Sequence, residues 1–346
     1  MNRVFFLILI IAFLLVPLSI NNVNDDGVSY FDLVLEVSES LFENSETDKK
    51  NNVTLSDSQK QLISEKLQAL TNSNKNLFNN FEETQEENLK DINEYIALNR
   101  WEKFSETNSG IKGIYLSGYH FLKDEKINPI KDILSNTVVN TIVLDVKSDN
   151  GHLLYDSAIP EVEMLKNERI KYDTQTLMDF KEEFDIYLIG RVVAFQDPIF
   201  SRVYPESAIT DIKTNRPYSQ DSQYFLDPSD SNSREYILNV ALEACLLGFD
   251  EIQFDYIRYP DTSYQGLVYD EKSSFENRTK NINSFLQNAT DLLHDNGCLV
   301  SADIFGYVLN SKNDNGIGQY LETIVNTVDF ISPMVYPSHY SKGSFG

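Results

Sequence analysis

The sequence predicts an α/β chain whose main domain is a (β/α)8 barrel of the TIM type. From Ile111 onward, short apolar runs of β-type residues alternate with amphipathic segments of helical spacing. Near-continuous apolar strands that alternate with helices are typical of a parallel sheet covered on its faces. Ionisable or hydroxylated residues also gather at the carboxyl end of each apolar run, where barrel enzymes carry their chemistry. These two observations favour a barrel over an open sheet.

Six apolar runs predict the strands, and the segments between them predict helices. The predicted strands are 113–120, 141–148, 185–195, 251–260, 298–308 and 329–337. The predicted helices lie near 129–135, 174–183, 234–247, 275–295 and 319–325. Because Gly346 follows the sixth strand closely and a complete barrel needs eight, we expect an incomplete barrel of about six βα units in a domain spanning 111–346.

The segment before this domain has two parts. Arg3 precedes an uncharged apolar run, Val4–Ile20, so residues 1–20 predict either a signal peptide or a membrane anchor. Both alternatives place the protein outside the cytoplasm, secreted or attached to the membrane through residues 4–20. The next segment, 21–110, is acidic and polar with sparse helical spacing, so we expect a partly helical or disordered spacer.

Composition argues against several classes of protein. The formal net charge is −24 and the pI is near 4.5, so sequence-independent binding of nucleic acid is not expected. No strand-to-helix turn carries a glycine-rich phosphate loop, which removes support for a dinucleotide cofactor. With four histidines and no pair at ligand spacing, a transition-metal centre is not expected either, although a hard-cation site made of carboxylates stays open. We therefore predict no cofactor and no metal.

The two cysteines, Cys245 and Cys298, each lie within an apolar stretch. Two cysteines in a chain of this length do not make a disulfide framework, so we interpret them as small buried apolar residues. A disulfide between them is the less favoured alternative.

Period-two alternation assigns the polar residues at the strand ends to shared faces. Asp145 and Lys147 share a face of the second strand. Arg191 on the third strand, Asp255 on the fourth and Asp303 on the fifth are each assigned by alternation to the corresponding face of their own strand. The charges therefore converge at one mouth. The alternatives are structural: an Asp145–Lys147 ion pair, an Arg191 clamp on a carboxylate, and a helix cap at Asp303.

Several motifs, in order, resemble one known family. They are KGIYLSGY (112–119), TIVLDVKSDNG (141–151), GRVVAFQDP (190–198), GFDEIQFDYIRYP (248–260) and DFISPMVYPSHY (329–340). This set resembles a family of mostly bacterial exported proteins, described as putative glycoside hydrolases and formerly as a domain of unknown function. The resemblance implies a (β/α)8 barrel related to the amylase-like glycosidases. It also implies a nucleophilic Asp255 after the fourth strand and an acid/base Asp303 after the fifth.

The sequence departs from the amylase-like pattern at two positions. Gln253 stands where that pattern has an Arg two residues before the nucleophile, and Asp303 is shorter than the usual Glu. Asp145 is therefore a rival for the acid.

We expect hydrolysis of a glycosidic bond in an extracellular or cell-envelope polysaccharide by two carboxylic acids. Arg191 and Lys147 are the expected cations for Asp255. The residues expected to line the cleft are Tyr119, Lys147, Arg191, Tyr256, Arg258, Tyr336 and His339. His339 is equally compatible with a plain loop residue.

Two other functions remain open from the sequence. A non-catalytic carbohydrate- or wall-binding barrel would use the acids only to bond sugar hydroxyls. A structural envelope protein would not bring Asp145, Asp255 and Asp303 together. The sequence does not predict an oligomeric state.

Overall fold

The computed structural model describes residues 93–336 and 338, except 109, 123, 161, 163–164 and 166–171. The predicted targeting segment, most of the predicted spacer, and His339 lie outside the described residues. None of the helices in the described part of the chain combines the length and apolar character needed to cross a bilayer.

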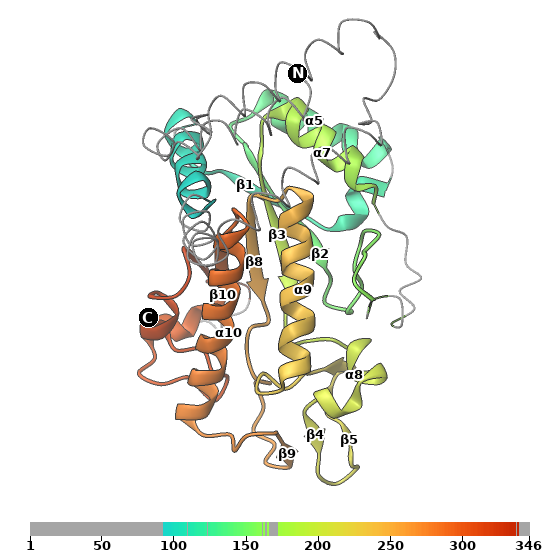
Figure 1. Ribbon diagram of the computed structural model, residues 1–346, viewed down its shortest axis with the longest axis vertical. Coiled ribbons are helices and arrows are strands. Elements are labelled where there is room, and N and C mark those ends of the chain that lie inside the picture. Colours follow the sequence, from blue (N-terminus) through green and yellow to red (C-terminus); the bar gives the residue numbers. More distant parts are fainter. Residues whose placement is uncertain are drawn as a thin grey trace, which may run out of the picture. The chain divides into compact units, whose positions relative to one another are not determined.

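Within the described residues, six parallel strands form one sheet in the order β1-β2-β3-β8-β10-β11. Their bounds are β1 Gly113–Leu116, β2 Thr141–Lys147, β3 Tyr187–Val193, β8 Glu251–Asp255, β10 Leu299–Phe305 and β11 Phe330–Met334. Each strand pairs with the next in parallel register. All six predicted strands are confirmed, and the sheet is that of an incomplete TIM-type barrel (Figure 1).

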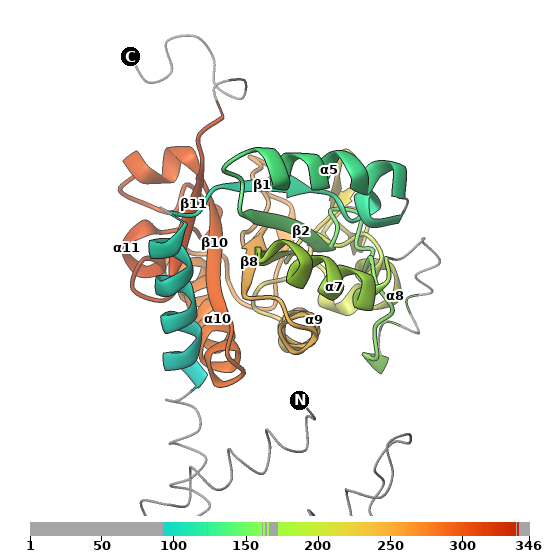
Figure 2. The same ribbon diagram turned by 90° about the horizontal axis from the view of Figure 1, so that it is seen from above.

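Helices follow the strands as the pattern predicts. They are α5 Asp124–Asn136, α7 Thr174–Phe184, α9 Ser231–Leu247, α10 Phe275–Asp295 and the short α11 Leu321–Ile324, and Figure 2 shows them arranged around the sheet. Three of them begin at side-chain caps: Asp173 accepts from Thr176 N–H at 2.8 Å, Asp230 from Ser233 N–H at 2.7 Å, and Ser274 from Asn277 N–H at 3.2 Å. The first predicted helix begins earlier than Pro129, because the proline lies inside α5 and does not start it.

Alternation along β8 separates the core from the site. Phe254 packs edge-on against Phe285 of α10, with ring centroids 5.3 Å apart, so this face of the strand lies in the hydrophobic core. Gln253 and Asp255 point to the opposite face, toward the barrel axis. The same strand thus anchors the fold and carries a candidate functional carboxylate.

The long irregular stretch after β3 forms an excursion beyond the carboxyl ends of the strands (Figure 1). It holds α8 Phe200–Val203, the 3-10 turn η2 Pro205–Ser207, and the short strands β4 Thr210–Asp211, β5 Arg216–Pro217, β6 Ser219–Gln220 and β7 Gln223–Tyr224. Strand β9 Leu267–Val268, from the loop after β8, pairs with β4. The excursion therefore builds one wall on the mouth side of the barrel.

A helix at residues 93–107 packs at the opposite end of the sheet. Its Trp101 ring lies 4.9 Å from that of Phe330, at the start of β11, and Phe104 lies 5.7 Å from Tyr187, at the start of β3. Arg100 Nε is 3.2 Å from the Asp250 carboxylate, just before β8. The packed body therefore includes the last part of the segment that the sequence assigns to the spacer.

Cys245 and Cys298 form a disulfide, with Cα atoms 5.9 Å apart. The interpretation of these residues as unbonded apolar side chains is therefore wrong. The bond joins the last turn of α9 to the residue before β10, two positions that the packing of α9 and α10 against neighbouring strands brings together. Their separation of 53 residues hides this proximity in the sequence.

Candidate functional site

Four charged residues meet where neighbouring strands end. Asp145 lies on β2, Arg191 on β3, Asp255 at the end of β8 and Asp303 on β10. Asp145 pairs in register with Arg191, and Arg191 with Gln253, so period-two alternation turns all four side chains toward the axis. The convergence that the sequence predicts is present in the structure.

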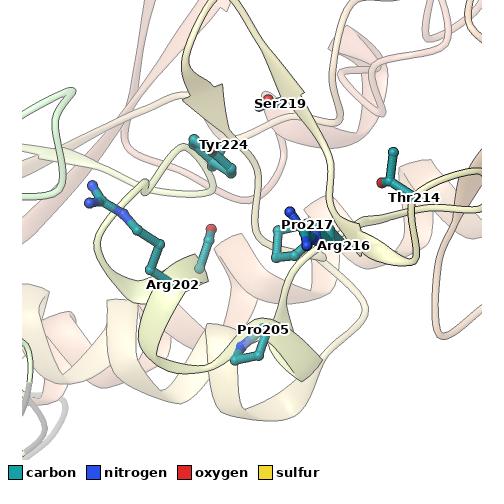
Figure 3. Close-up of a pocket in the computed structure, with 8 residues that line it drawn as sticks. Arg202, Pro205, Thr214, Arg216, Pro217, Ser219 and Tyr224 are labelled. Carbon is teal, nitrogen blue, oxygen red and sulfur yellow. The ribbon is translucent and has the colours of Figure 1, made fainter.

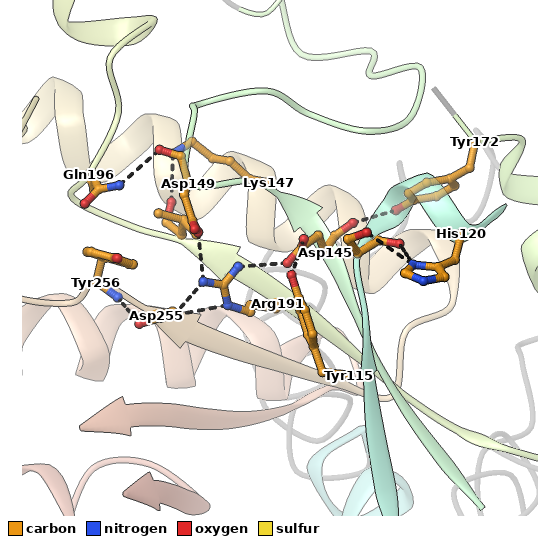
Figure 4. A network of polar contacts seen from close by, with 12 residues as sticks. Tyr115, His120, Asp145, Lys147, Asp149, Tyr172, Arg191, Gln196, Asp255 and Tyr256 are labelled. Atoms are coloured by element: carbon orange, nitrogen blue, oxygen red, sulfur yellow. Dashed lines mark hydrogen bonds and ion pairs between the residues drawn. The ribbon is translucent and has the colours of Figure 1, made fainter. Parts of the chain in front are cut away.

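Arg191 is the hub of this cluster (Figure 4). Its Nη1 donates to Asp145 at 2.8 Å, and its Nη2 donates to Asp149 at 2.9 Å and to Asp255 at 2.6 Å. Burial disfavours the charged guanidinium, but the carboxylates of Asp255, Asp149 and Asp145 together raise the pKa of Arg191 above its usual value. Arg191 therefore remains a cation and holds three acids in fixed positions.

Asp255 is held from two sides. One carboxylate oxygen accepts from Arg191 Nε at 3.1 Å and Nη2 at 2.6 Å, and the other accepts from the Tyr256 backbone N–H at 2.7 Å. Tyr256 has a φ of 51°, an uncommon backbone conformation for a bulky residue and one often found at functional sites. The sharp turn after β8 thus orients the Asp255 carboxylate. Arg191, from the neighbouring strand, supplies the cation that Gln253 does not.

Asp303 lies beside Asp255 in a different electrostatic environment. Its exposed fraction is 8%, and burial, followed by the negative charge of Asp255, raises its pKa well above the usual range. Arg191 and a hydrogen bond with Ser332 oppose this rise only in part. Gln253 in turn donates to the Ser332 hydroxyl at 3.0 Å. The site therefore combines an ion-paired carboxylate with a carboxyl that favours its protonated form.

Asp145 has a different set of partners. Besides Arg191, its carboxylate accepts from the Tyr115 hydroxyl at 2.7 Å. Burial raises the pKa of Asp145, while the bonds from Tyr115 and Arg191 counteract that rise. Asp145 therefore bonds to Arg191 and Tyr115 and helps to orient Arg191. Asp303, whose raised pKa favours the protonated form, is the better candidate for a proton donor.

Lys147 does not lie in this cluster. Its side chain is fully buried, and its Nζ lies 2.9 Å from the Asp197 carboxylate and donates to the Val193 carbonyl at 2.7 Å. The predicted contact with Asp255 and the alternative ion pair with Asp145 are both absent among the described residues. The cause is a register irregularity between Asp145 and Lys147, which ends the period-two alternation.

Aromatic side chains flank the acids. Tyr115 on β1 and Tyr336 after β11 are 56% and 53% exposed, so both offer ring surface at the mouth. The charges of Asp303 and Asp255, after burial, raise the pKa of Tyr336, which places this ring near both acids. Tyr256 follows Asp255 directly, and Arg258 follows it by three residues. Tyr119 lies in the 3-10 turn η1 Gly118–Leu122, after β1.

Three residues that shape the site were not predicted from the sequence: Tyr115, Asp149 and Ser332. Tyr115 lies on the first predicted strand, four residues before the candidate Tyr119, so period-two alternation from Tyr119 would have indicated it. Asp149 lies in a turn where Asp is common for local reasons, so no pattern distinguishes it. Within the described residues, no group of three His, Cys, Asp or Glu side chains is arranged to hold a metal ion.

A separate hollow of about 570 Å³ lies within the excursion after β3 (Figure 3). The residues that line it are Ser201, Arg202, Pro205, Thr214, Arg216, Pro217, Ser219 and Tyr224. This lining contains two arginines and no acid. It is therefore distinct from the carboxylate cluster.

Comparisons with known proteins identify the family from the sequence and support the fold from solved structures. The sequence profile of a family described as "putative glycosyl hydrolase domain" matches residues 113–346. A hypothetical protein from Ruminiclostridium thermocellum has a solved structure with 33% identity and a TM-score of 0.50, covering 55% of this chain and 96% of its own. The PgaB (BpsB) glycoside hydrolase domain from Bordetella bronchiseptica shares 10% identity, with a TM-score of 0.51, over 68% of this chain and 76% of its own. No curated protein sequence matches the chain.

Proposed function

The chain belongs to the family described as "putative glycosyl hydrolase domain", and we propose that it hydrolyses a polysaccharide with Asp255 as nucleophile and Asp303 as acid and then base. One observation carries this proposal. Two neighbouring buried carboxyls have opposite environments: Asp255 is paired with Arg191, and Asp303 has a raised pKa. Glycoside hydrolysis by two carboxyls requires this division of protonation states.

The proposed reaction has two steps. In the first, the Asp255 carboxylate attacks the anomeric carbon while Asp303 gives its proton to the leaving oxygen, so the glycosidic bond breaks and a glycosyl ester forms. In the second, Asp303 takes a proton from water, whose oxygen attacks the anomeric carbon and releases Asp255. Arg191 pairs with Asp255 and orients it throughout, and the exposed rings of Tyr115 and Tyr336 stack on neighbouring sugars.

A glycan hydrolysis screen with the full chain tests this proposal. Asp255→Asn and Asp303→Asn should each lower turnover of a responsive glycan by at least about a hundredfold. Glu183→Gln is the matched control, because Glu183 forms an exposed ion pair with Lys131 on the outer helices. Hydrolysis that is unchanged in Asp255→Asn would remove Asp255 from the mechanism.

The non-catalytic binding alternative receives less support from this geometry. A broken acid/base pair, with Asp303 pointing away from Asp255, would favour it, whereas the charge of Asp255 is a main cause of the raised Asp303 pKa. A structural protein with dispersed acids is likewise disfavoured, because Asp145 and Asp255 bond to the same guanidinium.

We also propose that the protein acts outside the cytoplasm, on an extracellular or cell-envelope polysaccharide. The apolar run at residues 4–20 supports export, with or without retention in the membrane. The disulfide between Cys245 and Cys298 is consistent with an oxidising compartment. Fractionation of cells that produce the full chain tests this: recovery in the cytoplasm would contradict it.

A further inference from the structure

Arg258 is a buried cation enclosed by aromatic rings. Its exposed fraction is 8%, and its guanidinium carbon lies 4.7 Å from the ring centroid of Phe305, 5.2 Å from Tyr256 and 5.6 Å from Phe225. Nη1 donates to the Tyr259 carbonyl at 3.0 Å, and Nε has no hydrogen-bond partner. Cation–π contacts of this kind stabilise the charge only in part.

Arg258 differs from the other well-buried cations among the described residues. Lys147 is paired with Asp197, Lys181 with Asp250, Arg278 with Asp314, and Arg191 with three carboxylates. No described carboxylate lies within 4.0 Å of Arg258. The charges of Asp261 and Asp255 act on the guanidinium, but neither forms an ion pair with it, and burial still lowers the pKa of Arg258. Because a buried charge without a close partner is costly, the guanidinium has the capacity to pair with a further anion.

The position of Arg258 ties it to the candidate active site. It follows Asp255 by three residues on the turn after β8, and Tyr256, which stacks on it, donates its backbone N–H to Asp255. Phe305, which also contacts the guanidinium, follows Asp303 by two residues along β10. The guanidinium therefore packs against rings of two residues that are close in the chain to the proposed catalytic acids.

An oxyanion would satisfy this guanidinium. A planar guanidinium binds carboxylates and sulfates through paired, charge-assisted hydrogen bonds, and Arg258 Nε makes no competing bond. The net charge of the chain does not forbid such a ligand, because at physiological ionic strength distant charges are screened beyond about 8 Å.

We propose that Arg258 binds an anionic substituent, a carboxylate or a sulfate, on a sugar next to the bond that is cleaved. The substrate class is then an acidic polysaccharide, and this inference rests on the proposed function. The hollow in the excursion, which Arg202 and Arg216 line without an acid, gives a second basic spot on the mouth side. Both features fit a chain with repeated negative groups.

Binding measurements with matched charged and neutral probes test this proposal. The protein is the full chain carrying Asp255→Asn, which prevents turnover during the measurement. The probes are tetragalacturonate with its methyl ester, and a sulfated galactose tetramer with its desulfated form. We expect one charged probe to bind at least about tenfold more tightly than its neutral partner in isothermal titration calorimetry, the value typical of a charge-assisted hydrogen bond. The better pair identifies the source of the anion.

Variants assign this preference to the residue. Arg258→Met keeps a linear apolar stem between the rings and should abolish the tenfold preference, whereas Arg258→Lys should keep part of it. Arg234→Met is the matched control: Arg234 is half-buried on α9, bonds to Ser284, and has no carboxylate partner among the described residues. It should leave the preference unchanged.

Two results would overturn the inference. One is equal affinity for the charged and neutral members of both pairs, including no measurable binding of either charged probe. The other is a preference that persists in a folded Arg258→Met variant. Failure of the proposed function is a separate result, in which no glycan shows hydrolysis that depends on Asp255. Cleavage of neutral glycans that depends on Asp255, without preference for charge, would refute the role of Arg258 alone.

Discussion

Replacing Lys147 by Met should destabilise the protein without directly removing a substrate contact. Lys147 and Asp197 are both fully buried, with Nζ and the carboxylate 2.9 Å apart. The variant leaves the Asp197 carboxylate buried without its cationic partner, although its Oδ1 still accepts from the backbone N–H groups of Ile199 and Phe200. Removing one partner of a buried ion pair costs about 3–5 kcal/mol. For a folded body of this size, that loss lowers Tm by about 6–20 °C.

Urea and thermal unfolding followed by circular dichroism measure this effect. Lys147→Met/Asp197→Asn should recover part of the loss, because neutral Asn keeps accepting the two N–H bonds. Lys131→Met is the control, since the exposed Lys131–Glu183 pair should contribute less than about 1 kcal/mol. A Lys147→Met protein with normal stability but weaker glycan binding would contradict the structural role of Lys147 and would indicate that it contacts the substrate.

Three further predictions follow from burial and charge. Asp303 must be protonated to donate its proton, and burial and the charge of Asp255 raise its pKa. We therefore expect kcat to stay high at pH values above the usual carboxyl pKa and to fall as the pH rises through the raised pKa of Asp303. A pH–rate profile checks this, and an alkaline limb that survives in Asp303→Asn would contradict it. Burial raises the pKa of Glu251 from 4.5 to about 7, so the folded state binds this proton more tightly than the unfolded state. The free energy of unfolding should therefore fall by about 3 kcal/mol between pH 4.5 and 7. Urea titrations at several pH values measure this fall, which should be smaller in Glu251→Gln. Reducing the Cys245–Cys298 bond, whose cysteines are 53 residues apart, should lower the free energy of unfolding by about 4 kcal/mol. Thermal unfolding with and without reductant measures this, with the Cys245→Ala/Cys298→Ala variant as the reference. A Tm that is insensitive to reductant would show that the bond contributes little.

Much of the fold was predictable because it depends on local patterns. Apolar strands alternate with amphipathic helices along this chain, and the structure confirms the six strands within a few residues of their predicted ends. Alternation also predicted that Asp145, Arg191, Asp255 and Asp303 meet at one mouth. The main differences are at the ends of two strands. The first ends at Leu116, before a 3-10 turn that begins at Gly118, and the fourth, predicted to reach 260, ends at Asp255.

What the sequence did not predict depends on interruptions and on distant partners. The irregularity after Asp145 sends Lys147 to Asp197, and period-two alternation has no means of anticipating it. The raised pKa of Asp303 depends on the position of Asp255 on the neighbouring strand, so it requires the register of the sheet. The disulfide and the docking of Trp101 on Phe330 likewise join residues far apart in the chain.

The helix at residues 93–107 sets a practical limit on where this domain can be cut. The family match starts at residue 113, but shortening the protein to that point would uncover Phe330 and Tyr187 and take Arg100 away from the buried Asp250. Asp250 would keep only Lys181 as an ionic partner among the described residues. Recombinant versions that begin after the helix should therefore aggregate more readily than versions that begin before it, even though both contain every proposed catalytic group.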